Sequence, residues 1–379
     1  MLSFVRNSGW ARTGQMRLAG FAAGGLGLVA TLAGAPVPPA VPQGTVTNFP
    51  GDLANVSADS PSDAWAVGAN GESPVVLHWT GTSWTPVPVP GGAHSVVAAV
   101  SALSPTDAWA VGTFPGHPAA NTRVLHWNGT RWVRVPIPSS GISDSLNSVS
   151  AVSASDAWII GDRATRLGTR AMALHWNGNS WRSVPVPSPP QEAMLSVSAD
   201  SPSDAWAVGW HIVGAAEAVK SLTLHWNGSR WTRVPSPNPG DGSSAPLHGV
   251  SAVSSRDAWA VGSYFTGRTG KVLILHWDGS RWTQVPGHMP GGDIALSGVS
   301  AISGRDAWAV GEVGTDTLVL HWNGTSWAHV ASPSPRHLSA LASVSAESGS
   351  DAWAVGCGCY GRGGHTLVLH WNGTSWVRS

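Results

Sequence analysis

The chain has 379 residues, 21 basic and 21 acidic side chains, and only 11% charged residues, where soluble domains usually carry about 25%. This neutral, sparsely charged composition argues against a nucleic-acid partner, which would require a basic surplus for phosphate contacts, and against a long charged tail. Trp occurs 23 times against two Tyr and five Phe, so some feature of the chain requires Trp at regular intervals.

The first 35 residues have the composition of an export segment. Arg6, Arg12 and Arg17 precede an apolar run at residues 18–35 that ends in small residues, which is typical of a secretory signal. An uncleaved membrane anchor is the alternative, because Pro36 directly follows and a run of about 18 apolar residues is near the lower limit for a membrane span. We therefore expect a secreted or cell-surface protein that contacts a membrane only through an uncleaved N-terminal segment, with residues 36–44 as a Pro-rich spacer.

A hexamer of the type DAWAVG then recurs seven times. Its aspartates are Asp63, Asp107, Asp156, Asp204, Asp257, Asp306 and Asp351. A His-Trp pair follows each hexamer, with its histidine at His78, His126, His175, His225, His276, His321 and His370. A further Trp five residues later completes a trio that accounts for 21 of the 23 tryptophans. Self-similarity at roughly 40–50 residues is typical of solenoids and propellers, so residues 45–379 are predicted to form one repeat domain.

Each repeat contains four short β-rich runs. In residues 249–286 these are GVSAVS, DAWAVG, VLILHW and WTQVP, separated by turn residues and without helical apolar periodicity. Asn-Gly or Asp-Gly after the His-Trp pair, replaced by Thr-Gly in the first repeat, predicts a tight hairpin. Because the middle strands are apolar on both faces, the sequence predicts an all-β, seven-bladed β-propeller with four antiparallel strands per blade.

The four strands are expected to have fixed places within a blade. The first strand, with small SVSA-type residues, should lie innermost, where the blades crowd together. The last strand carries prolines at alternate positions, such as Pro86, Pro88 and Pro90, which removes N–H donors along one edge and suits an outermost strand. Residues 45–50 resemble the end of such a strand, so we expect them to pair with the seventh blade and close the ring.

From residue 53 to residue 379, the repeat resembles the β-propeller families built from WD, kelch and Asp-box units. The hairpin HWNGTSW at residues 321–327 shares the Gly and the final Trp of an Asp-box, but Leu320 and Trp322 replace its Ser and Asp. The Trp-Asp dipeptide of WD repeats occurs once, at Trp277-Asp278. The resemblance implies the propeller architecture and no particular activity.

The repeated Asp and His are interpreted as structural. They should be neighbours, because the second and third strands run antiparallel, and an Asp beside a His resembles half of a catalytic triad. The pair occurs seven times, however, whereas an active site is assembled once, so we expect a hydrogen bond that fixes each blade. The sequence has no nucleophile elbow, HExxH, phosphate loop or zinc-spaced Cys/His cluster, and no catalytic residue, metal site or cofactor is predicted.

The only cysteines are Cys357 and Cys359, too few for the disulfide framework of a small secreted domain. Three states are open for them: a strained disulfide, which export favours, two free thiols, or half of a soft-metal site with a partner such as His365.

The loop between the second and third strands is the predicted binding region, because its length varies while the strand motifs stay constant. The candidate ligand-binding residues there are Phe114, Trp210, Tyr264, Phe265, Arg268 and Tyr360. Exposed aromatic side chains among polar ones suit carbohydrate stacking or a protein-binding hot spot. The alternative is that these side chains only pack the loops over the mouth of the channel.

We therefore expect a monomeric, exported scaffold that binds carbohydrate or a surface protein through this loop face. An extracellular polysaccharide hydrolase or lyase is the alternative, with Glu72, Glu217, Glu312 or Asp316 as candidate acids, and a structural cell-surface protein is the third. The enzyme requires two carboxylates about 5–10 Å apart in one cleft.

Overall fold

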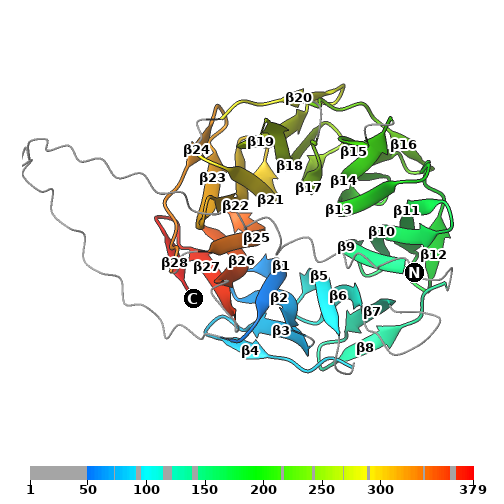
Figure 1. Ribbon diagram of the computed structural model, residues 1–379. Helices are drawn as coiled ribbons and strands as arrows, with labels where there is room; N and C mark the ends of the chain where they lie inside the picture. Colours follow the sequence, from blue (N-terminus) through cyan, green and yellow to red (C-terminus); the bar gives the residue numbers. More distant parts are fainter. Residues whose placement is uncertain are drawn as a thin grey trace, which may run out of the picture. The chain divides into compact units, whose positions relative to one another are not determined.

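The computed structural model describes residues 49–379, except 72, 91–94, 114–121, 139–143, 215–216, 241–243, 268, 288–290, 336–337 and 359–363. These residues form seven four-stranded antiparallel sheets arranged as blades of a ring (Figure 1). The predicted seven-bladed β-propeller is therefore confirmed. Within the described residues there is no helix, and so none that is long and apolar enough to cross a membrane.

In every blade the chain order of the strands is also their spatial order, from the ring axis outwards. The first strands are β1 (Asp52–Ser60), β5 (Val96–Ser104), β9 (Asp144–Ser153), β13 (Glu192–Ser201), β17 (Leu247–Ser254), β21 (Ile294–Ser303) and β25 (Ser339–Ser348). The second strands are β2 (Asp63–Asn70), β6 (Asp107–Thr113), β10 (Asp156–Thr165), β14 (Asp204–Val213), β18 (Asp257–Thr266), β22 (Asp306–Val313) and β26 (Asp351–Gly358). The third strands are β3 (Ser73–Trp79), β7 (Thr122–Trp127), β11 (Gly168–Trp176), β15 (Ala218–Trp226), β19 (Thr269–Trp277), β23 (Asp316–Trp322) and β27 (His365–Trp371). The fourth strands are β4 (Trp84–Pro86), β8 (Trp132–Val135), β12 (Trp181–Val184), β16 (Trp231–Arg233), β20 (Trp282–Gln284), β24 (Trp327–His329) and β28 (Trp376–Arg378).

The hydrophobic core lies between the blades, because the middle strands alternate their side chains between two neighbours. In β18, Ala258 and Ala260 pack with Trp206 and Leu247 on the blade 4 side, whereas Trp259 packs with residues of blade 6. The same division into two apolar faces recurs at the other interfaces. A sheet that is buried on both faces requires a neighbour on each side, and the ring supplies one.

Three tryptophans meet at each blade interface. Trp65 of blade 1 lies with its ring centroid 4.9 Å from Trp127 and 5.0 Å from Trp132 of blade 2, the second contact being T-shaped. The same arrangement occurs at all seven interfaces, including the one between blades 7 and 1, where Trp353 meets Trp79 and Trp84. The tryptophan repeat therefore builds the contacts between blades.

The innermost strands form a closed ring of hydrogen bonds. The Oγ of the Ser that directly precedes Ala in each SVSA-type segment accepts the backbone N–H of the corresponding Ala in the next blade, as Ser57 does from Ala102 at 3.0 Å. Six further bonds of 3.0–3.1 Å continue round the ring, and the last joins Ala58 to Ser345. Small hydroxyl residues thus satisfy backbone donors that no strand of their own sheet reaches.

The hexamer ends in Gly because the first strand bulges opposite it. The register between β21 and β22 shifts between Leu296 and Gly298, and a Cβ on Gly311 would lie 2.0 Å from the carbonyl oxygen of Ala295. The corresponding glycines of five other blades meet a first-strand carbonyl in the same way, and Gly262 of blade 5 meets the carbonyl of Pro246, directly before β17. Only a residue without a side chain fits beside this bulge.

The fourth strands lie on the perimeter (Figure 1), and Pro86, Pro88 and Pro90, at the end of β4 and directly after it, are exposed. Between Pro86 and Pro88, Val87 donates its N–H to the Val76 carbonyl of β3. The alternation of prolines therefore leaves the inward hydrogen bonds intact and removes the outward donors, as predicted.

Candidate functional site

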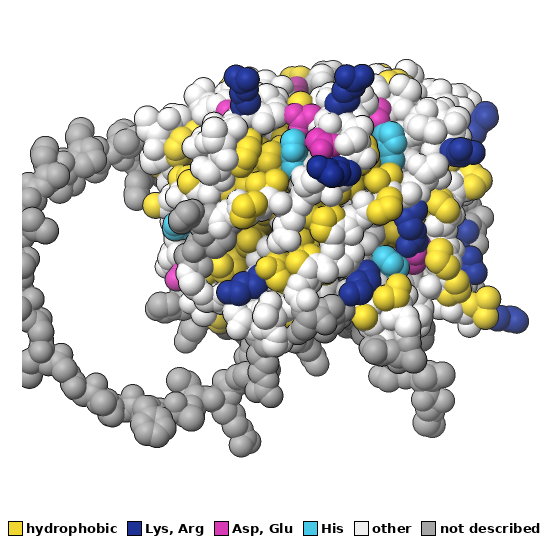
Figure 2. Space-filling model, turned by 90° about the horizontal axis from the view of Figure 1, so that it is seen from above, with side chains coloured by type: hydrophobic (Ala, Val, Ile, Leu, Met, Phe, Trp, Pro, Cys, Tyr) yellow, Lys and Arg dark blue, Asp and Glu magenta, His cyan; other side chains and the backbone are white. Residues whose placement is uncertain are grey.

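The ring has two faces of different character. The tight-turn face carries the turns between the first and second strands and between the third and fourth strands. The variable-loop face carries the hairpin tips between the second and third strands together with the connectors between blades. Figure 2 views the wall between the two faces, where hydrophobic side chains form yellow bands and Lys and Arg side chains project at the edges.

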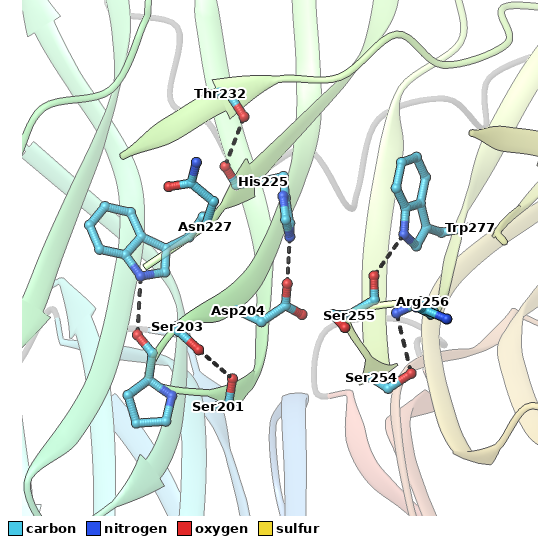
Figure 3. A network of polar contacts seen from close by, with 12 residues as sticks. Ser201, Ser203, Asp204, His225, Asn227, Thr232, Ser254, Ser255, Arg256 and Trp277 are labelled. Atoms are coloured by element: carbon cyan, nitrogen blue, oxygen red, sulfur yellow. Dashed lines mark hydrogen bonds and ion pairs between the residues drawn. The ribbon is translucent and has the colours of Figure 1, made fainter. Parts of the chain in front are cut away.

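The tight-turn face is built from the same contacts in every blade. In blade 4, His225 Nε2 bonds to Asp204 Oδ1 at 2.5 Å, and the Trp226 indole N–H donates to the Pro202 carbonyl in the first turn (Figure 3). All seven Asp–His pairs are hydrogen-bonded, at 2.5–3.3 Å. Each of these histidines also packs against the Trp of its own hexamer, as His78 does on Trp65 at a centroid distance of 4.0 Å.

The turn between the third and fourth strands is equally regular. Gly81, Gly129, Gly178, Gly228, Gly279, Gly324 and Gly373 all have positive φ, as the Asn-Gly signal predicted. In most blades the Asn or Asp side chain preceding this Gly accepts two backbone N–H groups of the turn, as Asn227 Oδ1 does from Ser229 and Arg230. A face with seven nearly identical turns offers little to a ligand that binds once per molecule.

Three blades carry a second acid on the tight-turn face, four residues before the repeated Asp. Burial and the neighbouring Asp63 carboxyl raise the pKa of Asp59 to about 7. Burial and the neighbouring Asp204 raise the pKa of Asp200 to about 6, and burial and Asp351 raise that of Glu347 to about 7. The remaining blades hold an apolar residue at this position: Leu103, Val152, Val253 and Ile302.

On the variable-loop face, the hairpins of blades 3, 4 and 5 are taller than those of blades 1 and 6. Strands β10, β14 and β18 continue four residues beyond the glycine of the hexamer, whereas β2 and β22 continue two. At 3.3–3.4 Å per residue, two more residues raise a hairpin by about 7 Å. We call the parts of β10–β11, β14–β15 and β18–β19 beyond that glycine the crest.

The connectors between blades bind the neighbouring hairpins together. Gln191 donates its N–H to Thr169 of β11, and its carbonyl accepts the N–H of Ile212 in β14. The next connector repeats this arrangement, because Ala245 donates to Val219 of β15 and Ser244 accepts from Phe265 of β18. The crest is therefore one hydrogen-bonded surface and not three separate loops.

Two ion pairs with largely buried carboxylates lie at the base of the crest. Arg163 of β10 bonds to Asp144 of β9 at 3.0 Å, and the fully buried Glu192 of β13 pairs with Arg233 of β16. Burial and the charges of Arg233 and Lys220 lower the pKa of His211, which lies opposite Glu192. These ion pairs were not predicted from the sequence. In blade 6 the positions of Glu192 and His211 are occupied by the apolar Ile294 and Val313, which lie opposite each other.

The predicted ligand-binding residues are only partly described. Trp210 is half-buried on β14, and Tyr264 is half-buried on β18, where it packs on the core between blades 4 and 5. Phe265 is exposed near the tip of the same hairpin. Phe114, Arg268 and Tyr360 lie outside the described residues. Their binding role stays a prediction.

Six large hydrophobic side chains are exposed among the described residues: Val96 (37%), Val133 (38%), Leu167 (73%), Val213 (39%), Phe265 (39%) and Leu338 (49%). Val133 lies on the outer wall in β8, and the other five lie on the variable-loop face. The aliphatic members were not predicted, because only aromatic loop residues carried the expected signal for carbohydrate stacking or a protein-binding hot spot. Leu167 and Val213 lie on hairpins whose second strand continues four residues beyond the hexamer glycine, so the length of this extension is the sequence signal for them.

The described candidate acids of the enzyme alternative lie on two blades, 4 and 6. Glu312 faces Thr317 across the β22–β23 hairpin, so the adjacent Asp316 projects to the opposite face of the sheet. Glu217 is on blade 4, and Glu72 lies outside the described residues. Cys357 is disulfide-bonded, Cys359 lies outside the described residues, and no group of three or more metal-ligating side chains occurs among those that are described.

The architecture defines a seven-bladed β-propeller with a uniform face and an individual face. It is similar to YCF48 bound to D1 peptide, with a TM-score of 0.54, 16% identity, and coverage of 86% of this chain and 98% of that one. It is also similar to YCF48 from Cyanidioschyzon merolae (TM-score 0.52, 15% identity, 86% and 97% coverage) and to the fucose-specific lectin from Aleuria aurantia (TM-score 0.45, 12% identity, 74% and 95% coverage). At such low identity the similarity shows the fold alone. No protein-family model and no curated protein matches the sequence.

Proposed function

We propose that this propeller is an exported scaffold that binds a carbohydrate or a surface protein through its variable-loop face. The observation that carries the proposal is the distribution of the six large hydrophobic side chains that are exposed in the described part of the chain, because five of them lie on that face. Exposed apolar groups that gather on one surface mark interaction sites. The YCF48 structure, in which a protein of the same fold is bound to a peptide, agrees with a binding role for the architecture.

The binding face is tested by paired substitutions. Trp210→Ala and Phe265→Ala should weaken binding to the glycan or protein that an array identifies, because an apolar anchor central to a contact contributes about 2 kcal/mol or more. Arg230→Ala and Arg281→Ala, on the tight-turn face, are the matched controls and should bind as the parent does. Circular dichroism shows whether each variant is folded. If only the two tight-turn variants lose binding, the ligand binds the tight-turn face and the proposed face is wrong.

Export is tested separately. Expression of the full chain in a secreting host should place the protein in the medium, and its N-terminal residue identifies the cleavage site. Cleavage after Ala35 supports a signal peptide, and retention of residues 1–35 in the membrane fraction supports the anchor. A protein that stays in the cytoplasm contradicts both forms of the proposal.

A further inference from the structure

The crest presents one exposed apolar side chain on each of its three hairpins. Leu167 lies in the tip of β10–β11, Val213 ends β14, and Phe265 is the second-last residue of β18. Three consecutive blades therefore carry a row of apolar groups at the highest described level of the variable-loop face. Neighbouring blades pack like stacked sheets about 10 Å apart, so the row extends over about 20 Å or more.

Basic side chains accompany this row. Arg166 is exposed beside Leu167, Arg170 follows on β11, and Lys271 is exposed on β19. Within the described residues these three have no carboxylate partner, and the Arg170 guanidinium donates to the Ser188 carbonyl at 2.9 Å. Lys220 of β15 adds a fourth cation.

The acids of the crest are fewer. Within the described residues of the crest they are the exposed Glu217 at the β14–β15 tip and the half-buried Asp162 of β10. Asp293 lies beside the crest, in the connector before β21, and its carboxylate accepts the N–H of Gly270 at 2.7 Å. The carboxylates of Asp144 and Glu192 are already paired with arginines beneath the surface. Counting exposed and half-buried side chains alike, the described part of the crest therefore carries more cations than acids, although the whole chain is neutral.

We infer that the crest is a docking surface for an extended, acidic segment of a partner protein that carries apolar side chains at intervals. This inference rests on the proposed function and names its ligand class. An extended segment of about six to eight residues spans the row at 3.3–3.4 Å per residue. Its apolar side chains cover Leu167, Val213 and Phe265, and its carboxylates face the arginines and Lys271.

The geometry favours a protein segment over a glycan. Sugar rings stack on aromatic faces, and two of the three exposed crest tips are aliphatic. The connectors also fix the crest through backbone hydrogen bonds at Gln191 and Ser244. A surface ordered before binding loses little conformational freedom when a flexible segment docks.

The test uses defined fluorescent peptides of about eight residues. One set alternates Leu with Glu, a second alternates Leu with Lys, and a third alternates Ser with Glu. The Leu-Glu set should bind the full chain most tightly in fluorescence anisotropy, and higher salt should weaken this binding through screening. Leu167→Ser with Phe265→Ser, and separately Arg166→Glu with Lys271→Glu, should each weaken it by about tenfold or more.

Val133→Ser on the outer wall and Arg230→Glu on the tight-turn face are the matched controls, and both should bind as the parent does. Equal binding of the Leu-Glu and Leu-Lys sets, or unchanged binding in the crest variants, would overturn the inference. If the protein binds array glycans but none of the peptides, and Trp210→Ala abolishes the glycan binding, the peptide-docking inference is overturned and the proposed function stands. If the two control variants abolish peptide binding and the crest variants do not, both the inference and the proposed function are overturned.

Discussion

The Asp that opens the second strand of each blade is hydrogen-bonded to the His at the end of the third strand. The His ring in turn packs against the hexamer Trp, so each blade has an Asp–His–Trp unit in which the polar contact fixes an apolar one. Sequence reasoning predicted the hydrogen bond, because antiparallel pairing brings the two strand ends together. The contact between the His and Trp rings was not predicted.

Asp306→Ala and Asp204→Ala should each lower the free energy of unfolding by about 1–3 kcal/mol, because the partner His loses its acceptor in a largely buried site. Urea unfolding measures the loss, and Asp306→Asn, which keeps an acceptor oxygen, should lose less. Ligand binding should persist in all three variants. An Asp variant that unfolds like the parent but no longer binds would show a specialised blade.

The second acids of blades 1, 4 and 7 predict a dependence of stability on pH. Asp has an ordinary pKa of 3.8 and Glu of 4.5, whereas folding raises the pKa of Asp59 and Glu347 to about 7 and of Asp200 to about 6. The folded state therefore binds more protons than the unfolded state between these values. Their contribution to stability is fully present below pH about 4 and is lost as the pH rises through about 6–7.

Asp59→Leu, which copies Leu103 of blade 2, should therefore raise the melting temperature at pH about 8 and change it less at pH about 5. Glu347→Gln should act in the same direction. Thermal melts of the parent and the variants between pH about 5 and 8 give the dependence of melting temperature on pH, which should be less steep in the variants. Parallel curves for parent and variants would contradict the prediction.

At the scale of the strand, the bulge in each first strand explains the invariable last residue of the hexamer. Gly311→Ala should destabilise the protein by about 2 kcal/mol or more, because the new Cβ meets the Ala295 carbonyl and the backbone must shift. Gly291→Ala is the control, since a Cβ there meets nothing within 4 Å. Chemical denaturation compares the two, and equal midpoints would contradict the assignment.

The strands themselves were predictable, and their contacts with other blades were not. Period-2 apolar runs, Asn-Gly turns and alternate prolines depend on contacts within one blade. The strand order of the blade, its hairpin turns and its outermost strand could therefore be predicted from the sequence. The contact of Trp65 with Trp127 and Trp132, and the bond from Ala102 to Ser57, join residues about one repeat apart. The sequence repeat shows that these Trp, Ser and Ala residues recur in every blade, but it does not show which of them are in contact across a blade interface.

At the scale of the whole molecule, residues 49–51 complete the seventh blade. The N–H of Thr366 in β27 donates to the Phe49 carbonyl, Gly51 donates to Gly364, and Pro50 bridges to His365. In blade 6 the end of the outer strand occupies the same place, where Ser334 accepts the N–H of Thr317. The predicted pairing of the N-terminal segment with blade 7 is therefore present for Phe49 and Pro50, and residues 45–48 lie outside the described ones.

Deletion of residues 45–50 should lower the melting temperature by a few degrees, because the start of β27 loses its outer partner. Deletion of residues 36–44, the Pro-rich spacer, is the control. Differential scanning calorimetry measures both proteins. An unchanged melting curve for the first deletion would show that these bonds add nothing to stability.

The variable-loop face shows how far a sequence can predict a site. Loop-length variation predicted that the blades differ on this face, and the residues beyond each hexamer glycine were countable in advance, whereas its binding role stays a prediction. The buried pair of Glu192 with Arg233 was not predictable, because strand pairing and the long Arg side chain bring together groups far apart in the sequence. Neither was the hydrogen bonding of the connectors, which have no periodic pattern.

The seam between blades 7 and 1 has the same Trp trio and the same Ser–Ala bond as the six others. No blade is thus physically the first, and the order of the blades is circular although the chain is linear. A circularly permuted chain, joined from Ser379 to Phe49 by a short linker and opened at the Gly314–Thr315 hairpin tip, would retain every interface between blades. Permutation would move the chain ends to another blade and leave the crest intact.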